Sequence, residues 1–278
     1  MGQDLVGVLL VLSVGWILGY RSSRSGRWWI LGYAFPVGLL FLIGLLRHFP
    51  TLSLLPVFGW ILSGRNEYFI LAVIVSVLFG NLIPRIPQLR LKILVAIFMI
   101  IAGLYYCVSP FVLPMILYRS HQRLQTVIDH AGVCIQQTHY TCGPAAAVTA
   151  LKCLGVEAQE GLLAIQAYSS PVSGTPEDWL CRAIESLYGE QGVRCQTRSF
   201  DSIDPLRDLC PVIAVVGYAP LVDHYITLME FRDDVIVAGD PAVGLQYLPY
   251  EDFQKRWRNI GIVVKRETST HTNEEKTL

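Results

Sequence analysis

The distribution of apolar and polar residues divides this chain into two halves that meet near residue 118. The first half contains four long apolar runs separated by short polar loops: residues 5–20, 28–46, 69–83 and 93–117. Apolar runs of about this length are typical of helices that cross a membrane. Arg, Trp and Tyr residues flank the runs, as they do at membrane interfaces. The pattern therefore predicts about four transmembrane helices within residues 1–118.

Two stretches of the first half need a separate interpretation. Residues 52–62 are apolar but few, and they contain Pro56 and Gly59, so we interpret them as a re-entrant or interfacial segment, with a fifth span as the alternative. The first run differs from a typical signal peptide because Asp4, rather than Lys or Arg, precedes it and no small-residue cleavage site follows. We therefore count it as a span.

Charge is distributed as unevenly as hydrophobicity. The chain has 278 residues, 53% of them hydrophobic, and a formal net charge of zero. Residues 1–118 hold eight Lys/Arg against two acidic residues, a net of +6, and the remainder holds 14 basic against 20 acidic residues, a net of −6. No basic cluster in the second half indicates nucleic acid as a partner.

The loop charges predict an orientation in the membrane. The loops between the first and second runs and between the third and fourth runs each carry +3, and the positive-inside rule places both in the cytoplasm. Four spans then leave both termini and the second half of the chain outside the cytoplasm, whereas a fifth span would reverse the second half. The charges of these loops belong to Arg21, Arg24, Arg27, Arg85, Arg90 and Lys92.

From about residue 119 the pattern becomes that of a soluble domain, predicted to extend to residue 265. Helices are expected first, at 142–154, 158–168 and 175–188, and strands follow at 193–200, 211–218, 224–231, 235–239 and 260–264. The pattern predicts a hairpin turn at residues 232–234 and a short helix at residues 250–257. Helices followed by an antiparallel sheet indicate an α+β fold. The polar tail, residues 266–278, is predicted to be disordered.

One stretch of this domain has the features of a cysteine nucleophile. Cys142 opens an Ala-rich helix through Gly143 and Pro144, and proline suits a first helical turn. A thiol at a helix N-terminus lies in the positive field of the helix dipole, which favours the thiolate. Gln136, six residues earlier, can direct its amide to the same place as an oxyanion donor. Gln137 is adjacent, but the six-residue spacing favours Gln136.

A cysteine nucleophile needs a base and a group that orients the base. His224 begins one predicted strand, and Asp240 ends the next. The turn at 232–234 brings these strand ends within a residue or two of each other, so the Asp240 carboxylate can accept the imidazole N–H. Asp223 is a weaker candidate for that role. The plain alternative is that Cys142 is a small buried residue and Asp240 a turn residue.

These residues resemble a known family. Gln136 and the run Thr141 to Ala146, then His224-Tyr225-Ile226 and the run Gly239 to Gly244, resemble the bacteriocin-processing cysteine peptidases, papain-like domains that cleave after double-glycine leaders and are often fused to ABC exporters. The resemblance covers roughly residues 125–265. It implies that Cys142 is the nucleophile, His224 the general base and acid, Asp240 the orienting group, and Gln136 the oxyanion donor together with the Cys142 backbone N–H.

The sequence departs from the family in two ways. The family often has Asp before the nucleophile, where Thr141 stands here, and no phosphate-binding Gly-x-x-x-x-Gly-Lys-Ser/Thr motif occurs. ATP-coupled export and a nucleotide partner are therefore not expected, and the substrate stays open. The same acyl-enzyme also permits acyl transfer to an amine or thiol, and a non-catalytic peptide-binding domain is a third alternative.

Few other partners or cofactors are indicated. The chain has seven cysteines but no C-x-x-C, so no zinc site and no cofactor are expected. Buried free thiols are the default for the other cysteines, and disulfides of unassigned pairing are the alternative for an extracytoplasmic domain. Almost no charge lies within the apolar runs, which argues against an ion or proton pathway. The sequence thus predicts a multi-pass membrane protein whose extracytoplasmic peptidase domain acts on peptides near the lipid bilayer.

Overall fold

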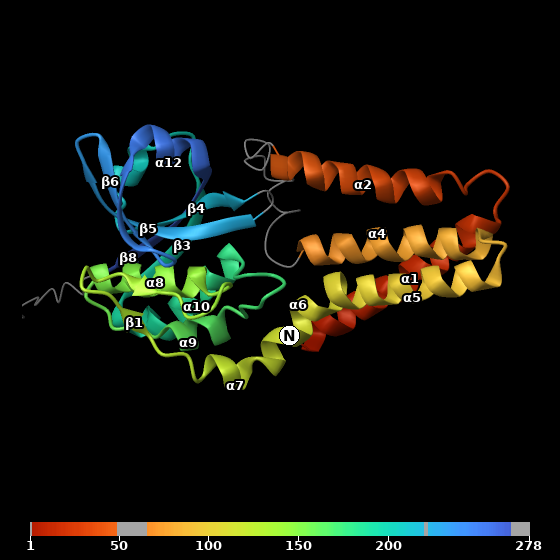
Figure 1. Ribbon diagram of the computed structural model, residues 1–278, viewed down its shortest axis with the longest axis horizontal. Coiled ribbons are helices and arrows are strands. Elements are labelled where there is room, and N and C mark those ends of the chain that lie inside the picture. Colours follow the sequence, from red (N-terminus) through yellow and green to blue (C-terminus); the bar gives the residue numbers. More distant parts are fainter. Residues whose placement is uncertain (1, 49–65, 220–221, 268–278) are drawn as a thin grey trace, which may run out of the picture. The chain divides into compact units, whose positions relative to one another are not determined.

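The computed structural model describes residues 2–48, 66–219 and 222–267, and the chain divides into two compact units (Figure 1). One unit comprises Met1–Gln122 with Tyr168–Pro176, and the other comprises Arg123–Ala167 with Glu177–Leu278. The predictions for residues 52–62 and for most of the tail lie outside the described residues. Arg266, at the start of the predicted tail, instead ends a β-strand.

The first unit consists of helices in its described ranges. Its α-helices are α1 (Gly2–Arg24), α2 (Leu31–His48), α4 (Asn66–Leu82), α5 (Leu89–Gly103), α6 (Ser109–Ile116) and α7 (Tyr118–His121). A 3₁₀ turn, Ile83–Arg85, follows α4, and a π-helical turn, Leu104–Val108, joins α5 to α6. The π turn keeps α5 and α6 in one long apolar segment that also accommodates Pro110 and Pro114.

Three helices of the described ranges are long and apolar enough to cross a membrane: Asp4–Arg24, Asn66–Arg85 and Leu89–Ile116. The fourth predicted span corresponds to a shorter apolar helix, Leu31–Leu46. Residues 28–46 were expected to form a full span, but residues 28–30 lie in a turn and the apolar helix covers only Leu31–Leu46. The other three runs extend into longer helices, because polar residues at their ends continue the helical hydrogen bonding.

Small residues bring α1 and α4 into close contact. A Cβ added at Gly19 would lie 2.3 Å from the Val77 carbonyl oxygen, and one at Gly80 would lie 2.5 Å from the Trp16 carbonyl oxygen. Only glycine permits this approach of two helix backbones, a common basis of helix packing in membranes. A small core of Val8, Ala72, Cys107 and Phe111 lies beside this contact.

The second unit has an α+β fold, as predicted. Its helices are α8 (Cys142–Cys153), α9 (Glu160–Gln166), α10 (Glu177–Tyr188), α11 (Asp204–Arg207) and α12 (Tyr250–Arg256), with a 3₁₀ turn at Gly189–Gln191. Its strands are β1 (Val127–Ile128), β2 (Cys134–Ile135), β3 (Val193–Ser199), β4 (Val212–Ala219), β5 (Val222–Arg232), β6 (Val235–Asp240), β7 (Gly244–Pro249) and β8 (Trp257–Arg266). The short strand β7 was not predicted from the sequence.

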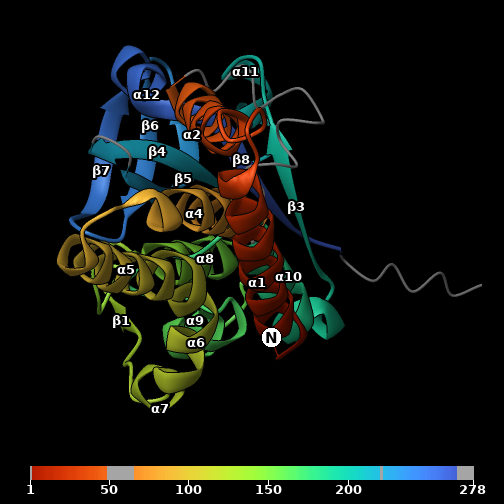
Figure 2. The ribbon, with the colours of Figure 1, turned by 90° about the vertical axis from the view of Figure 1, so that its right-hand side faces the viewer.

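The larger sheet within the described residues has the strand order β3-β8-β4-β5-β6-β7, and neighbouring strands are antiparallel. Helices α8, α9 and α10 cover one face and α12 lies over the other (Figures 1 and 2). Alternation along β4 serves both faces, because Ile213 and Val215 pack with α8 and α10 while Val212 and Ala214 pack with Phe253 of α12. Strand β8 returns from the end of the chain to the middle of the sheet.

Two of the cysteines do not follow the expected default. Cys181 on α10 and Cys195 on β3 form a disulfide, so the expectation of free thiols was wrong for this pair. Their separation of 14 residues has no signature in the sequence, and the pairing arises because α10 packs along the edge strand β3. The other five, all in described ranges, are free: Cys107, Cys134, Cys142, Cys153 and Cys210.

Candidate active site

Cys142 is the first residue of α8, as the sequence predicted, and its side chain is 8% exposed. Thr141 precedes it with a non-helical backbone (φ −101°, ψ 20°), so the helix begins at the sulfur-bearing residue. The N–H groups of a first helical turn have no acceptor within the helix, and they make this end electropositive. The Cys142 sulfur thus lies at the electropositive end of α8.

Small side chains hold α8 close to the sheet. Ala145, Ala146 and Ala147 are fully buried. The Thr227 hydroxyl on β5 donates a hydrogen bond of 2.7 Å to the Ala146 carbonyl, one turn from Cys142. Thr227 lies three residues beyond His224 on the same strand. This bond therefore fixes the helix that begins with Cys142 against the strand that carries His224.

His224 and Asp240 are brought together by the hairpin of β5 and β6. The register pairs Thr227 with Gly239, which places Asp240 beside the start of β5. His224 Nε2 lies 2.8 Å from Asp240 Oδ1, and both side chains are buried. Asp240 Oδ1 also accepts the Ala242 N–H at 2.9 Å, within a tight turn that closes at Gly244 with a φ of +93°. Glycine suits that position because other residues are strained there.

The electrostatics of His224 follow from these partners. Burial alone lowers the pKa of His224, but hydrogen bonding with Asp240 and with Cys142 outweighs burial and raises the pKa to about 9. Because Asp240 engages Nε2, the other ring nitrogen, Nδ1, is left for the thiol. Burial alone raises the pKa of the Asp240 carboxyl, and the hydrogen bonds from His224 and the Ala242 N–H lower it below its usual value. Asp240 and Cys142 thus both favour the imidazolium form of His224.

Gln136 lies next to this group through its backbone. Its N–H donates a hydrogen bond of 3.0 Å to the carbonyl of Pro241, the residue after Asp240. Its side-chain Oε1 is buried and has no hydrogen-bond partner among the described residues. Gln137, in contrast, is exposed and turns its Nε2 to the Ile135 carbonyl at 3.3 Å.

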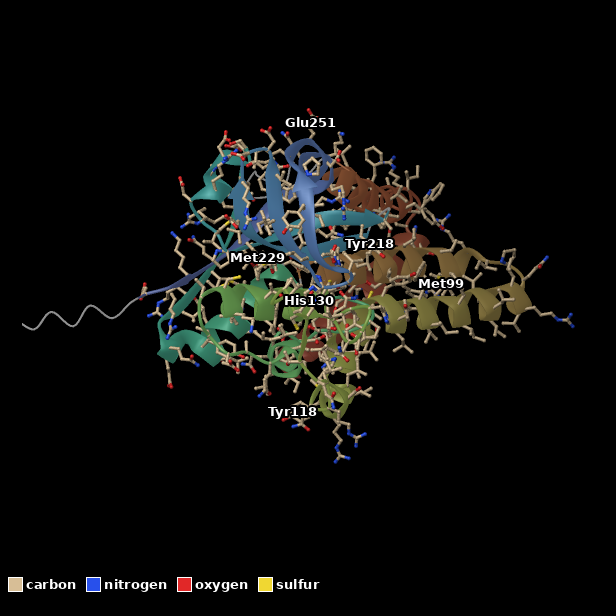
Figure 3. The ribbon with its side chains drawn as sticks, turned by 60° about the vertical axis from the view of Figure 1, so that its left-hand side comes forward. Met99, Tyr118, His130, Tyr218, Met229 and Glu251 are labelled. Atoms are coloured by element: carbon tan, nitrogen blue, oxygen red, sulfur yellow. A yellow bond between two sulfur atoms is a disulfide. The ribbon has the colours of Figure 1, made fainter. Side chains whose placement is uncertain are left out.

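Asp223, the weaker candidate, has another partner. Its Oδ1 accepts a hydrogen bond of 2.8 Å from Nε of Arg258, and half of its side chain is exposed. The ring of Tyr218, 67% exposed and visible in Figure 3, lies 5.4 Å from the His224 ring by centroids. Tyr218 thus lies beside the imidazole, whereas Asp223 is engaged with Arg258. Within the described ranges, no group of three or more His, Cys, Asp or Glu side chains is arranged to hold a metal ion.

Comparison with known proteins identifies the domain. The family model of the peptidase C39 family matches residues 131–269, half of the chain. The chain belongs to the peptidase C39 family. This membership confirms the resemblance drawn from the sequence, and the protein is a cysteine peptidase.

Sequence relatives occur in two archaea. An uncharacterised protein of Methanothermobacter marburgensis is 32% identical over 132 residues, which cover 48% of this chain and 87% of the relative. An uncharacterised protein of Methanothermobacter thermautotrophicus is 29% identical over 143 residues, covering 51% of this chain and 94% of the relative. Each alignment thus covers about half of this chain and most of the relative.

Solved structures with some similarity are peptidase domains of transporters. One is a double glycine motif protease from an AMS/PCAT transporter in complex with the leader peptide, 18% identical, covering 52% of this chain and 96% of that chain, with a TM-score of 0.42. Another is the peptidase domain of Streptococcus ComA, a bifunctional ABC transporter of a quorum-sensing pathway, 20% identical, covering 52% and 100%, with a TM-score of 0.43. At these TM-scores they add nothing to the family match.

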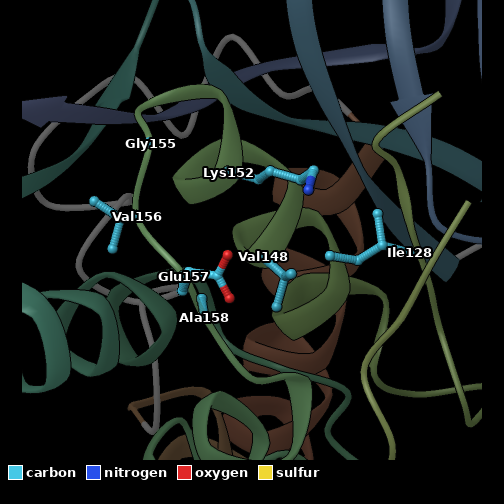
Figure 4. A pocket seen from close by; sticks show the side chains of 7 residues that line it. All are labelled: Ile128, Val148, Lys152, Gly155, Val156, Glu157 and Ala158. Atoms are coloured by element: carbon cyan, nitrogen blue, oxygen red, sulfur yellow. The ribbon is translucent and has the colours of Figure 1, made fainter. Parts of the chain in front are cut away.

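A separate pocket lies elsewhere in the C39 domain (Figure 4). It opens between β1 and the second half of α8, and none of its lining residues is a predicted site residue. Its lining includes one base and one acid, Lys152 and Glu157, both exposed. It plays no part in the site described above. The lining residues are Ile128, Val148, Lys152, Gly155, Val156, Glu157 and Ala158.

The Tyr225–Glu177 pair and Glu160 of the peptidase domain were not predicted from the sequence. The Tyr225 hydroxyl bonds to the Glu177 carboxyl, and burial raises the pKa of both groups. Glu160 is fully buried and its Oε1 accepts the Gln137 N–H at 3.0 Å. A single acidic residue in a mixed stretch has no periodic signal, so only the packing of α9 against the loop before Cys142 identifies Glu160.

Proposed function

We propose that Cys142, His224, Asp240 and Gln136 form the catalytic site of this peptidase. The thiolate of Cys142 attacks the carbonyl carbon of a peptide bond, and His224 gives its proton to the departing amine. His224 then takes a proton from water, which attacks the thioester and releases the acid with the regenerated thiol. Gln136 and the Cys142 N–H stabilise the oxyanion in both steps.

One observation carries this proposal, namely the buried 2.8 Å hydrogen bond between His224 Nε2 and Asp240 Oδ1. A carboxylate there selects the tautomer and orientation of the imidazole and stabilises the imidazolium. Hydrogen bonding with Cys142 adds to the raised pKa of His224 and links the pair to the sulfur. The place of Gln136 supports an oxyanion role, because its backbone N–H is held by the Pro241 carbonyl, next to Asp240.

The substrate class that we propose is a peptide with a double-glycine leader. Membership of the peptidase C39 family and the resemblance of the motifs to those of bacteriocin-processing peptidases support it. A synthetic leader peptide that contains Gly-Gly is thus the first probe. Mass spectrometry of its products separates hydrolysis, which leaves a free carboxyl end, from acyl transfer, which leaves a conjugate.

The pH dependence tests the role of Asp240. Because the pKa of His224 is raised to about 9, its imidazolium persists below that pH and is lost above it. We expect kcat/KM to fall as the pH rises through about 9. Asp240→Asn removes a carboxylate that raises this pKa, so the alkaline decline should move to lower pH and kcat/KM at neutral pH should drop roughly 10²- to 10⁴-fold. An unchanged alkaline limb in Asp240→Asn contradicts the proposal.

We further propose that the first unit anchors the peptidase in a membrane with the domain outside the cytoplasm. Three helices of the described ranges have spanning length, and α2, with its 18 residues, extends about 27 Å, close to the thickness of a bilayer core. A crossing by α2 is what allows both loops of charge +3 to lie in the cytoplasm. The Cys181–Cys195 disulfide supports the external side, where oxidising conditions prevail.

The free thiol of Cys153 provides a test of this orientation. Cys153 is exposed at the end of α8. In intact cells, a membrane-impermeant maleimide should label Cys153, and Cys153→Ser should abolish that labelling. Labelling that requires permeabilised cells would instead place the domain in the cytoplasm and favour a further crossing at residues 52–62.

A further inference from the structure

Glu160, at the start of α9, is a fully buried acid without a charged partner to compensate its burial. The peptidase domain leaves its side chain 0% exposed. Burial raises the pKa of Glu160, and the groups that lower it are the Gln137 N–H and the Thr141 hydroxyl, neither of them a cation. Burying a carboxyl group in this way is costly. The partners of Glu160 indicate a role that accounts for this cost.

The first partner lies beside Gln136. The Gln137 N–H donates a hydrogen bond of 3.0 Å to Glu160 Oε1, and the Gln136 N–H donates one of 3.0 Å to the Pro241 carbonyl. These two N–H groups belong to the peptide units on either side of the Gln136 Cα. Because both units are held, the backbone of Gln136 and the direction of its side chain are fixed. One of the two restraints is the carboxyl group of Glu160.

The second partner lies beside Cys142. Thr141 does not cap α8 with its side chain. Its hydroxyl instead accepts the Thr138 N–H at 3.2 Å and is close enough to the Glu160 carboxyl to lower its pKa. A single carboxyl thus faces both ends of the loop 137–141, the end that follows Gln136 and the end that precedes Cys142. The distance between the oxyanion donor and the nucleophile depends on this loop.

We propose that Glu160 is a positioning residue that holds Gln136 and the Cys142 N–H in the geometry of an oxyanion hole. The inference rests on the proposed function and extends it to a residue that touches neither substrate nor sulfur. Preorganised donors act on charge that develops in the transition state, so a loosened donor lowers kcat and leaves ground-state binding almost unchanged. The reactivity of the thiol itself, set by His224 and Asp240, should not depend on Glu160.

Two probes separate these effects in the full-length protein. A peptide aldehyde with a C-terminal glycinal adds the Cys142 sulfur to its carbonyl carbon, and the carbonyl oxygen, which takes its proton from His224, occupies the oxyanion hole. Iodoacetamide alkylates the thiolate with loss of iodide and forms no oxyanion. The inhibition constant of the aldehyde therefore reports on the oxyanion hole, and the alkylation rate of Cys142 reports on the thiolate. Hydrolysis of the Gly-Gly leader peptide is measured alongside.

In Glu160→Ala we expect kcat to fall about 10- to 100-fold with KM within about twofold, and the aldehyde to bind more weakly by a similar factor. The rate of Cys142 alkylation should stay within about twofold of the unsubstituted protein, since the thiolate is unaffected. Glu160→Gln should recover much of the loss, because its side-chain carbonyl can accept the Gln137 N–H. Glu157→Gln, an exposed site three residues earlier, is the matched control and should change nothing.

Several results would overturn the inference. A Glu160→Ala protein with unchanged kcat and aldehyde affinity shows that Glu160 positions nothing. Loss of alkylation together with kcat shows a general disruption of the domain. Additive losses in Gln136→Ala/Glu160→Ala show that Glu160 does not act through Gln136, because residues that act as a unit are non-additive. An unsubstituted protein that neither cleaves the leader peptide nor binds the aldehyde instead defeats the proposed function itself.

Discussion

Replacing Cys142 with alanine is expected to abolish peptide hydrolysis, with a fall in kcat of roughly 10⁴- to 10⁶-fold. The sulfur is the atom that forms the acyl-enzyme, and no neighbouring group can take over this bond. The residual rate reflects substrate binding and the oxyanion donors alone. The measurement is cleavage of the Gly-Gly leader peptide by the full-length protein in detergent or liposomes, followed by mass spectrometry.

The same helix provides a matched control for this experiment. Cys153 is the last residue of α8, and its side chain is exposed, whereas Cys142 is the first residue and is buried. Cys153→Ala should cleave at the rate of the unsubstituted protein. Substituting alanine for a small buried cysteine removes only one heavy atom, so the melting temperature of Cys142→Ala should change little. Substantial cleavage by Cys142→Ala would contradict the assignment of the nucleophile.

Replacing His224 with alanine is expected to remove both hydrolysis and the reactivity of the thiol. The imidazole supplies the acid for the departing amine and the base for water, so kcat should fall about 10⁴-fold or more. The thiolate also loses the cationic partner that stabilises it, so alkylation of Cys142 by iodoacetamide near neutral pH should slow markedly. The pH profile of alkylation should move upward, toward that of an ordinary thiol.

His130 serves as the control for this substitution because its side chain is exposed and visible in Figure 3. His130→Ala should retain both hydrolysis and alkylation.

The free energy of unfolding of His224→Ala, compared with that of the unsubstituted protein as a function of pH, is a further check. A His with a raised pKa contributes stability below pH 6.5, and that contribution is lost as pH rises through about 9. A variant that keeps rapid alkylation near pH 7 would show that His224 does not stabilise the thiolate.

In our proposal, the first half of the chain serves the second by holding the peptidase domain at a bilayer. A peptidase held at a bilayer meets peptides that emerge from it or lie on it, and tethering raises the effective concentration of such substrates. The glycine contacts between α1 and α4 give the first unit a fixed core of its own. We propose that this unit serves as an anchor rather than a transport pathway, in accordance with the sparse charge of its apolar helices.

The elements of the peptidase domain follow largely from local pattern. Helix α8 was predicted at 142–154 and spans Cys142–Cys153, because Gly-Pro and a run of small apolar residues define a helix start without tertiary help. The hairpin of β5 and β6 was predicted for a similar reason, since two β-branched runs flank a polar turn. Cys142, His224 and Asp240 were found because each stands at an end of such an element, and Gln136 was found by its spacing from Cys142.

Contacts between residues far apart in the sequence were decided by the tertiary structure alone. The place of β8 between β3 and β4 and the Cys181–Cys195 disulfide have no local signal. The hydrogen bond from Gln137 to the buried Glu160 joins segments 23 residues apart. Sequence by itself indicated which side chains we propose for the chemistry, because periodicity and helix ends are local properties. Only the packed structure decided what holds them in place, because burial and register depend on the whole sheet.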